Sequence, residues 1–264
     1  MTVTEWDAAD YAQISALQKV MADEALGLLR LEGSERVLDV GCGDGKITAE
    51  IGARVPRGSV LGVDPSADMI RFASSHFDPG HWPNLRFEVA DVRHLPYRQE
   101  FDLVVSFNAL HWVPEQAQAL ASIRAALKSD GRAMLRLVPQ GERKSLEDVI
   151  EDVRKRPRWA GYFTGFRTPY LHLAPQEYRA LAEGAGLRVL GVTVQDEAWE
   201  FKTREAFQAF GHATFAEWTR HVPAGEWPAF ISEVLDAYRA VAAKRPEEAN
   251  TFKFYQMQVT FAPA

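Results

Sequence analysis

Short apolar runs alternate with amphipathic segments along the first half of the chain. Apolar residues three and four positions apart predict helices over 11–31, 45–53 and 116–127, and a further helix that opens after Ser66, a favourable N-cap residue. Asp130–Gly131 is expected to end the third of these before the next strand. The remaining apolar runs predict strands at 37–40, 59–63, 85–89, 101–107 and 132–138. Strands that are apolar on both faces and alternate with helices are typical of a parallel sheet covered by helices.

The pattern changes after Val138. Residues 141–181 and 198–251 are rich in Trp, Phe, Tyr, Arg and Pro, whereas 188–197 and 255–261 predict two more strands. In the simplest topology these strands complete the sheet, and the aromatic helical segments form a cap over its ligand edge, beyond the carboxyl ends of the strands. We therefore predict an α/β fold with three layers: a Rossmann-like, seven-stranded, mostly parallel sheet with helices on both faces and a helical aromatic cap.

Composition narrows the class of protein. The chain has 264 residues, with 30 basic and 36 acidic side chains and a net charge of −6, which argues against a nucleic-acid binder held by phosphate contacts. A single cysteine, Cys42, excludes an intramolecular disulfide, and the seven histidines lack metal-ligand spacing. No secretory signal or membrane-spanning run is expected, so we predict a cytoplasmic protein that binds no metal, nucleic acid or membrane.

A glycine-rich loop follows the first strand, in the segment VLDVGCGDG of residues 37–45. Glycines at 41, 43 and 45 allow a sharp turn and a close approach of the backbone to a ligand. A dinucleotide fingerprint would need glycine at position 46, where this chain has Lys46, and no Walker A string occurs. A purely structural glycine turn is the alternative.

Acidic residues accompany three successive strands. Asp64, at the end of the second strand, is placed to accept hydrogen bonds from ribose hydroxyls, and Asp91, after the third, can accept from an adenine amino group. Asp39, just before the glycines, could face an ammonium group. Each alone is commonly a cap or turn residue, but together they indicate an adenosine ligand with a positively charged tail.

On these motifs, VLDVGCGDG, Gly62–Val63–Asp64 and Ala90–Asp91–Val92, the sequence resembles the class I S-adenosylmethionine-dependent methyltransferases over residues 36–138. The resemblance implies a methyltransferase with S-adenosylmethionine as its cofactor. The residues expected to contact the cofactor are Gln18, Asp39, Gly41, Cys42, Gly43, Gly45, Asp64, Pro65, Met69, Asp91, Val92, Phe107 and Asn108.

A narrower resemblance runs through nearly the whole chain. Tyr11 and Gln18, the segment 106–113, and the aromatic residues of 159–170 are similar to those of juvenile hormone acid methyltransferases and bacterial trans-aconitate methyltransferases, which methylate carboxylates of small organic acids. His111 matches the hormone branch better, whereas the Ala- and Arg-rich composition is typical of bacteria, so the branch stays open. The residues expected at the acceptor are Tyr11, Gln18, His111, Trp112, Tyr162, Phe166, Arg167 and Tyr170.

The sequence has no linker, repeat or low-complexity tract, so we predict a single methyltransferase domain over 1–264. It comprises an N-terminal helix in 1–35, a cofactor-binding half in 36–138, cap and substrate segments in 139–186 and 198–254, and last strands in 187–197 and 255–262. We expect a monomer or a weak homodimer.

The reacting group decides what the site must supply. A carboxylate acceptor is ionised at pH 7 and needs no base, whereas a phenol, with a pKa near 10, would benefit from one. His111 is the candidate base, or else a residue that positions the acceptor. Methylation of a phenol, an amine or a carbon centre is the alternative within this chemistry, and a non-catalytic S-adenosylmethionine-binding sensor is the alternative outside it.

Overall fold

The computed structural model describes residues 15–264. The strands are β1 (Arg36–Val40), β2 (Ser59–Asp64), β3 (Leu85–Val89), β4 (Phe101–Phe107), β5 (Leu127–Leu137), β6 (Leu187–Glu200) and β7 (Thr251–Pro263). The helices are α2 (Ser15–Leu28), α3 (Lys46–Arg54), α4 (Ala67–His76), α5 (Gln116–Ala126), α6 (Leu146–Arg154), α7 (Pro175–Gly184), α8 (Arg204–Thr214), α9 (Ala216–Thr219) and α10 (Trp227–Ala242). Short 3₁₀ turns are η1 (Val92–His94), η2 (Leu110–Trp112), η3 (Ala160–Phe163), η4 (Ala224–Glu226) and η5 (Pro246–Asn250).

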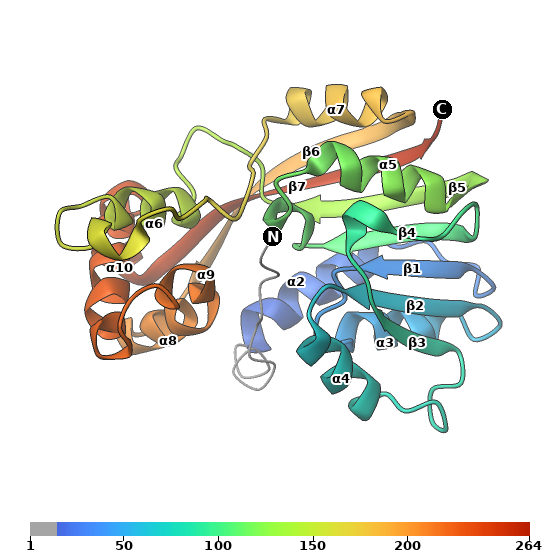
Figure 1. Cartoon of the computed structure of the whole chain (residues 1–264), viewed down its shortest axis with the longest axis horizontal. Coiled ribbons are helices and arrows are strands. Elements are labelled where there is room, and N and C mark those ends of the chain that lie inside the picture. The colour runs from blue at the N-terminus through green and yellow to red at the C-terminus, as the bar shows by residue number, and fades with distance from the viewer. Residues whose placement is uncertain (1–14) are drawn as a thin grey trace. The chain divides into compact units, whose positions relative to one another are not determined.

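The strands form one seven-stranded sheet in the order β3-β2-β1-β4-β5-β7-β6. Pairing is parallel from β3 through β5, as the neighbouring arrows of Figure 1 show, and β7 joins β5 antiparallel, with Leu135 opposite Val259. The parallel strands therefore bring their carboxyl ends to one edge, where segments from β1, β2 and β4 meet. The predicted α/β class and the mostly parallel, seven-stranded sheet are confirmed.

Helices cover both faces of the sheet, as predicted. On one face α2 and α3 pack on the strands through buried residues: Leu26, Val37, Ala49, Ile51, Val55, Val60, Leu85, Leu103 and Val105. On the other face α5 and α7 do so, among others through Leu38, Val104, Leu120, Ile123, Leu135, Tyr178 and Ala182. Neighbouring residues such as Val37 and Leu38 are both buried but belong to opposite faces, which explains the uninterrupted apolar runs.

The boundary between α5 and β5 differs from the prediction. The helix ends at Ala126, and the strand already begins at Leu127, so Gly131 lies inside the strand rather than at a helix terminus. Pairing of β4 with β5 shifts between Phe101 and Leu103, and a Cβ atom at position 131 would lie 2.9 Å from the carbonyl oxygen of Phe101. Gly131 therefore allows β4 and β5 to approach closely where their pairing is irregular. The local sequence does not distinguish such a glycine from one that ends a helix.

The chain divides into two compact units. Unit 1 contains the described residues up to 138, together with 170–194 and 257–264; unit 2 contains 139–169 and 195–256. Residues 170–186, assigned to the cap on the sequence, thus include α7, whose Tyr178 and Ala182 pack in the core of the sheet. In the described part of the chain, no helix is long and apolar enough to cross a membrane.

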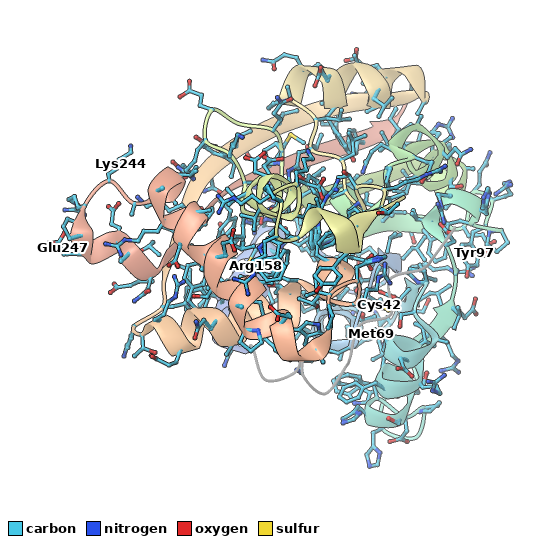
Figure 2. All side chains as sticks on the ribbon, turned by 60° about the vertical axis from the view of Figure 1, so that its left-hand side comes forward. Cys42, Met69, Tyr97, Arg158, Lys244 and Glu247 are labelled. Carbon is cyan, nitrogen blue, oxygen red and sulfur yellow. The ribbon has the colours of Figure 1, made fainter. Side chains whose placement is uncertain are left out.

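Unit 2 has an aromatic core of its own. Its fully buried side chains include Trp159, Phe207, Phe215, Trp218, Phe230 and Tyr238. The guanidinium carbon of Arg158, which is labelled in Figure 2, lies 4.4 Å from the centre of the Trp159 ring. The same guanidinium pairs with Glu226 at 2.9 Å. Many aromatic residues of the segments after Val138 therefore pack with one another.

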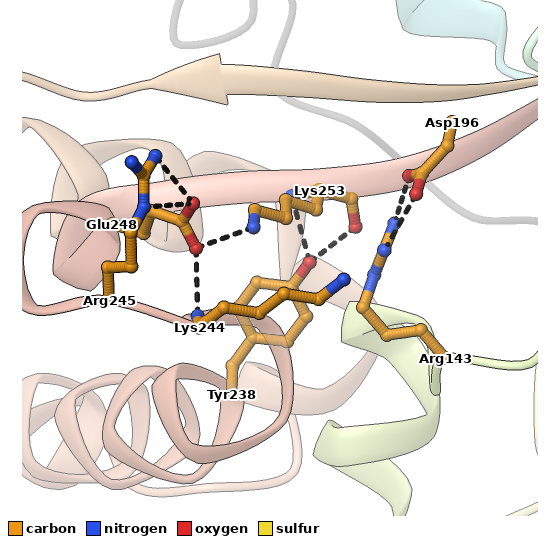
Figure 3. A network of polar contacts seen from close by, with 7 residues as sticks. All are labelled: Arg143, Asp196, Tyr238, Lys244, Arg245, Glu248 and Lys253. Carbon is orange, nitrogen blue, oxygen red and sulfur yellow. Dashed lines mark hydrogen bonds and ion pairs between the residues drawn. The ribbon is translucent and has the colours of Figure 1, made fainter.

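A polar network links α10, η5 and β7 in unit 2 (Figure 3). The Tyr238 hydroxyl on α10 donates to the carbonyl oxygen of Lys253 on β7 and accepts from its backbone N–H at 3.0 Å. Glu248 accepts from the Lys253 ammonium at 2.7 Å and from the backbone N–H of Lys244 at 2.8 Å. Hydrogen bonding from Lys253 lowers the pKa of Glu248 to about 2, so this carboxylate stays ionised over the usual pH range.

Candidate active site

The loop between β1 and α3 has a backbone that requires glycine. Gly41, Gly43 and Gly45 have φ angles of 75°, 53° and 82°, in the left-handed region. A Cβ atom at position 41 would lie only 2.2 Å from the Cβ of Ala109, in the segment after β4. The backbone N–H groups of Gly41 and Cys42 donate to the carbonyl oxygen of Val63 at 2.8 and 3.1 Å, which anchors the loop to β2.

Asp64 at the end of β2 joins this loop to α4. One carboxylate oxygen accepts from the backbone N–H of Gly43 at 3.1 Å, and the other from the backbone N–H of Ser66 at 2.9 Å. Ser66 is the N-cap of α4, as predicted, and its hydroxyl accepts from the backbone N–H of Met69 at 3.3 Å. A carboxylate oxygen can accept more than one hydrogen bond, so these contacts are chemically compatible with the predicted ribose contact of Asp64.

Asp39 is a buried carboxylate that lies before the glycines. Its side chain accepts from the Thr48 hydroxyl on α3 at 2.7 Å, and only 2% of the residue is exposed. Burial raises the pKa of Asp39 to about 7, and the charge of Asp64 adds to this, while Thr48 opposes it. A cation bound beside Asp39 would relieve this penalty, which fits the predicted ammonium partner. Thr48 was not foreseen, because its contact depends on how α3 packs against β1.

Asp91 is already engaged by a basic residue. It caps η1 by accepting from the backbone N–H of Arg93 at 2.9 Å, and the Arg93 guanidinium also binds its carboxylate and that of Glu115. Burial would raise the pKa of Asp91, but the hydrogen bonds from Arg93 outweigh it and hold the pKa below its ordinary value. The predicted adenine contact is therefore an ionised carboxylate that Arg93 holds in place.

The segment after β4 carries backbone strain. Asn108 has a φ angle of 56°, uncommon for a residue with a side chain, and its N–H donates to the carbonyl oxygen of Arg136 on β5 at 2.8 Å. Within the described part of the chain, its buried side-chain oxygen accepts no hydrogen bond. The positive φ angle and the unpaired acceptor of Asn108 are compatible with the predicted cofactor contact of Phe107 and Asn108, which stays a prediction.

Four rings of unit 1 cluster next to this turn. The ring centres of His111 and Trp112 are 5.4 Å apart, those of Trp112 and Tyr170 6.4 Å, and those of Tyr170 and His172 4.5 Å. The His111 ring also lies 5.7 Å from that of His172. His172, which the sequence did not single out, thus joins three predicted acceptor residues.

His111 is neutral in this cluster. It is 3% exposed, and burial, with a smaller effect of His172, puts its pKa well below the ordinary value. The backbone nitrogen of Val138 lies 3.5 Å from its Nδ1 atom and donates to it, a long hydrogen bond that favours the tautomer with the proton on Nε2. His111 therefore offers an N–H donor rather than a free basic nitrogen.

The remaining predicted site residues are distributed as follows. Cys42, Met69 and Val92 are buried in unit 1, where burial raises the pKa of the Cys42 thiol, and Pro65 is exposed there (Figure 2 labels Cys42 and Met69). Tyr162, Phe166 and Arg167 belong to unit 2, in which Tyr162 and Arg167 are exposed. Tyr11 and the side chain of Gln18 lie outside the described residues.

Phe166 is held within unit 2. Its ring centre lies 5.4 Å from that of Phe163 and 5.1 Å from that of His221, and the guanidinium carbon of Arg154 lies 4.7 Å from it. Arg154 in turn pairs with Glu151 at 2.6 Å. These contacts explain the position of the Phe166 ring without a bound acceptor.

The described side chains contain no group of three or more His, Cys, Asp or Glu residues able to hold a metal ion. The chemistry available at the sheet edge is instead that of three carboxylates, a tight glycine loop and a cluster of aromatic and imidazole rings. Such a set fits a nucleoside that carries a positive charge, because the acids can accept from hydroxyl, amino and ammonium groups.

Comparisons with known proteins identify the family. A family model described as a methyltransferase domain matches residues 37–131. A trans-aconitate 2-methyltransferase from Deinococcus radiodurans is 30% identical over 69% of each chain. A malonyl-[acyl-carrier protein] O-methyltransferase from Geobacter sulfurreducens is 33% identical over 72% of this chain and 70% of its own.

Solved structures show the same fold. The YcgJ protein from Bacillus subtilis aligns with a TM-score of 0.65 at 17% identity, over 92% of this chain and 97% of its own. A Haemonchus contortus phosphoethanolamine N-methyltransferase in complex with S-adenosyl-L-methionine aligns with a TM-score of 0.63 at 14% identity, over 97% of this chain and 57% of its own.

Fold and sequence together define an α/β methyltransferase. The chain belongs to the class I S-adenosylmethionine-dependent methyltransferases, near the trans-aconitate methyltransferase group. The predicted superfamily, enzyme class and S-adenosylmethionine cofactor are confirmed.

Proposed function

We propose that this methyltransferase transfers the methyl group of S-adenosylmethionine to a carboxylate of a small organic acid. The hydrogen bonding of His111 is the observation that carries the proposal. Its Nδ1 atom accepts from the backbone of Val138 at 3.5 Å, so the imidazole presents an N–H donor on Nε2. Such a donor suits an anionic oxygen. A phenol or an amine would instead need a residue that removes its proton.

The low pKa of His111 supports the same conclusion. A base works best when its pKa lies near the working pH, and burial moves His111 well below its ordinary value. A carboxylate is already ionised at neutral pH and needs only to be placed in line with the transferred methyl group, about 3 Å from it, with water excluded. We assign the placing to His111 and Trp112, with Tyr170 packed beside them.

The cofactor residues follow from the same geometry. We propose that Asp39 receives the ammonium group, Asp64 the ribose hydroxyls and Asp91 the adenine amino group, while Gly41–Gly45 lets the backbone approach. The bound cofactor supplies an electrophilic methyl group. The protein's part is to bind, orient and desolvate.

The names of the relatives support an acidic acceptor, because both trans-aconitate and a malonyl group carry carboxylates. We extend the proposal to a small-molecule acid handled in the cytoplasm by a monomer or weak homodimer, without nucleic acid or membrane.

A labelled-methyl assay tests the proposal. The protein is incubated with methyl-labelled S-adenosylmethionine and panels of di- and tricarboxylic acids, phenols and amines, with Gly41→Ala as the cofactor-binding control. We expect label in an acid, released by mild base as expected for an ester. A base-stable product contradicts carboxylate methylation, and cofactor binding without turnover on any panel favours the sensor alternative.

A further inference from the structure

A buried arginine lies at the ligand edge of the sheet. Arg136 is the penultimate residue of β5, is paired with Phe107 at the end of β4, and its carbonyl oxygen accepts from the N–H of Asn108 at 2.8 Å. Only 2% of the residue is exposed. Arg136 therefore lies next to the turn at Phe107 and Asn108. The other side chains at this end of β5 are apolar.

Among the described residues, the guanidinium of Arg136 has a hydrogen-bond partner on one nitrogen. Its Nη2 atom donates to a carboxylate oxygen of Glu24 on α2 at 2.9 Å. Among the residues whose side chains the structure describes, Nε and Nη1 are buried and find no acceptor. Burying unpaired donors of a charged group is costly, so sites that keep such donors usually have a partner for them.

Glu24 compensates the charge of Arg136 only in part. Its side chain is 38% exposed, so water screens its charge, whereas the Arg136 side chain is 2% exposed. An incoming carboxylate offers one negative charge and two acceptor oxygens, which is the chemistry that a guanidinium binds best.

We propose that Arg136 binds a carboxylate group at the ligand edge, a role that rests on the proposed function. The carboxylate comes either from an acid acceptor, as the group that is not being methylated, or from the methionyl end of the cofactor. Both sources share one chemistry, and the donors left on Nε and Nη1 hold the anion in either case. Arg136 is then a binding residue for a carboxylate, and it contributes to acceptor selection only where that carboxylate belongs to the acceptor.

Two variants separate this role from a structural one. Arg136→Met removes the donors and keeps an elongated side chain, whereas Glu24→Gln, the matched control, removes the ion pair and keeps the guanidinium. If Arg136 only holds α2 through Glu24, the two variants lose the same binding. If it binds an anion, Arg136→Met loses binding and Glu24→Gln keeps or improves it. Arg136→Lys, which retains charge, replaces Arg136→Met should the latter not fold cooperatively in thermal unfolding.

Calorimetry with defined probes identifies the source of the carboxylate. S-adenosylhomocysteine carries the methionyl carboxylate and 5′-methylthioadenosine lacks it. We expect Arg136→Met to weaken one carboxylate probe by about 30-fold or more. Loss for S-adenosylhomocysteine but not for 5′-methylthioadenosine assigns the cofactor. Loss confined to trans-aconitate, or to whichever acid is labelled in the methyl assay, assigns the acceptor.

Unchanged affinity for both kinds of probe, or equal losses in Arg136→Met and Glu24→Gln, overturns the proposal. The nucleoside measurements need no acceptor, so they remain decisive if no acid is methylated. In that event the function proposed above fails by itself.

Discussion

We expect Asp39, the proposed partner of the cofactor's ammonium group, to make cofactor binding depend on pH. The carboxyl group is 2% exposed, and burial raises its pKa to about 7. An ammonium group beside it favours the ionised form, so binding releases a proton, and affinity falls as the pH drops below that value. The fraction of Asp39 available for binding decreases about tenfold between pH 8 and pH 6 for a pKa near 7. This corresponds to about 1.4 kcal/mol of binding free energy.

The assay is calorimetry with S-adenosylhomocysteine from pH 6 to 8, in buffers of different ionisation enthalpy, which counts the released protons. Thr48→Val removes the hydroxyl that donates to the ionised carboxylate at 2.7 Å, so the pH midpoint should move up, whereas Thr48→Ser should leave it in place. Asp39→Asn should bind weakly and without pH dependence. Constant affinity of the wild-type protein across this range would refute the reasoning.

Other expected outcomes follow from single contacts. Gly41→Ala should reduce the affinity for S-adenosylhomocysteine at least tenfold in calorimetry, because its Cβ would lie 2.2 Å from that of Ala109. Gly43 has open space around it, so Gly43→Ala should only lower the free energy of unfolding in urea by roughly 1–2 kcal/mol, the cost of a left-handed residue with a side chain. Ser66→Ala removes the cap of α4 and should lower the unfolding free energy by about 1 kcal/mol, with Ser66→Asp as the control that keeps an acceptor; an unchanged value in Ser66→Ala would contradict the capping role. His111→Ala should raise KM for the acid while kcat falls by less than about 10² and keeps its pH profile, whereas His111→Gln, which retains an N–H donor, should recover KM; a larger loss of kcat would identify a base.

Local patterns were sufficient for the parts of the structure that local chemistry decides. The glycine loop was found because three glycines after an apolar strand predict a left-handed backbone, and the structure gives Gly41 a φ angle of 75°. Ser66 was found because capping involves residues three positions apart. Burial on both faces likewise predicted the parallel strands.

Contacts between distant segments could not be read in this way. Thr48 contacts Asp39 only once α3 is packed, and His172 lies beside His111 although the two are 61 positions apart in the sequence. Arg136 did leave a signal, a lone charge in the apolar run 133–138, but the sequence does not say what satisfies a guanidinium. The partner of Asp91 could not be predicted either, although Arg93 is only two positions away. The local sequence is the same whether that arginine binds Asp91 or is exposed to solvent.

The division of the chain constrains how such a protein can change in evolution. Unit 2 is encoded by two separate stretches, 139–169 and 195–256, and two of its four boundaries fall inside β6 and β7. A single genetic crossover cannot exchange that unit as a block, and a junction within either strand would have to preserve the alternation of its inward and outward residues. Recombination between relatives therefore disrupts the sheet more readily than it transplants unit 2. New acceptor preferences in this architecture are expected to arise by substitution of individual side chains.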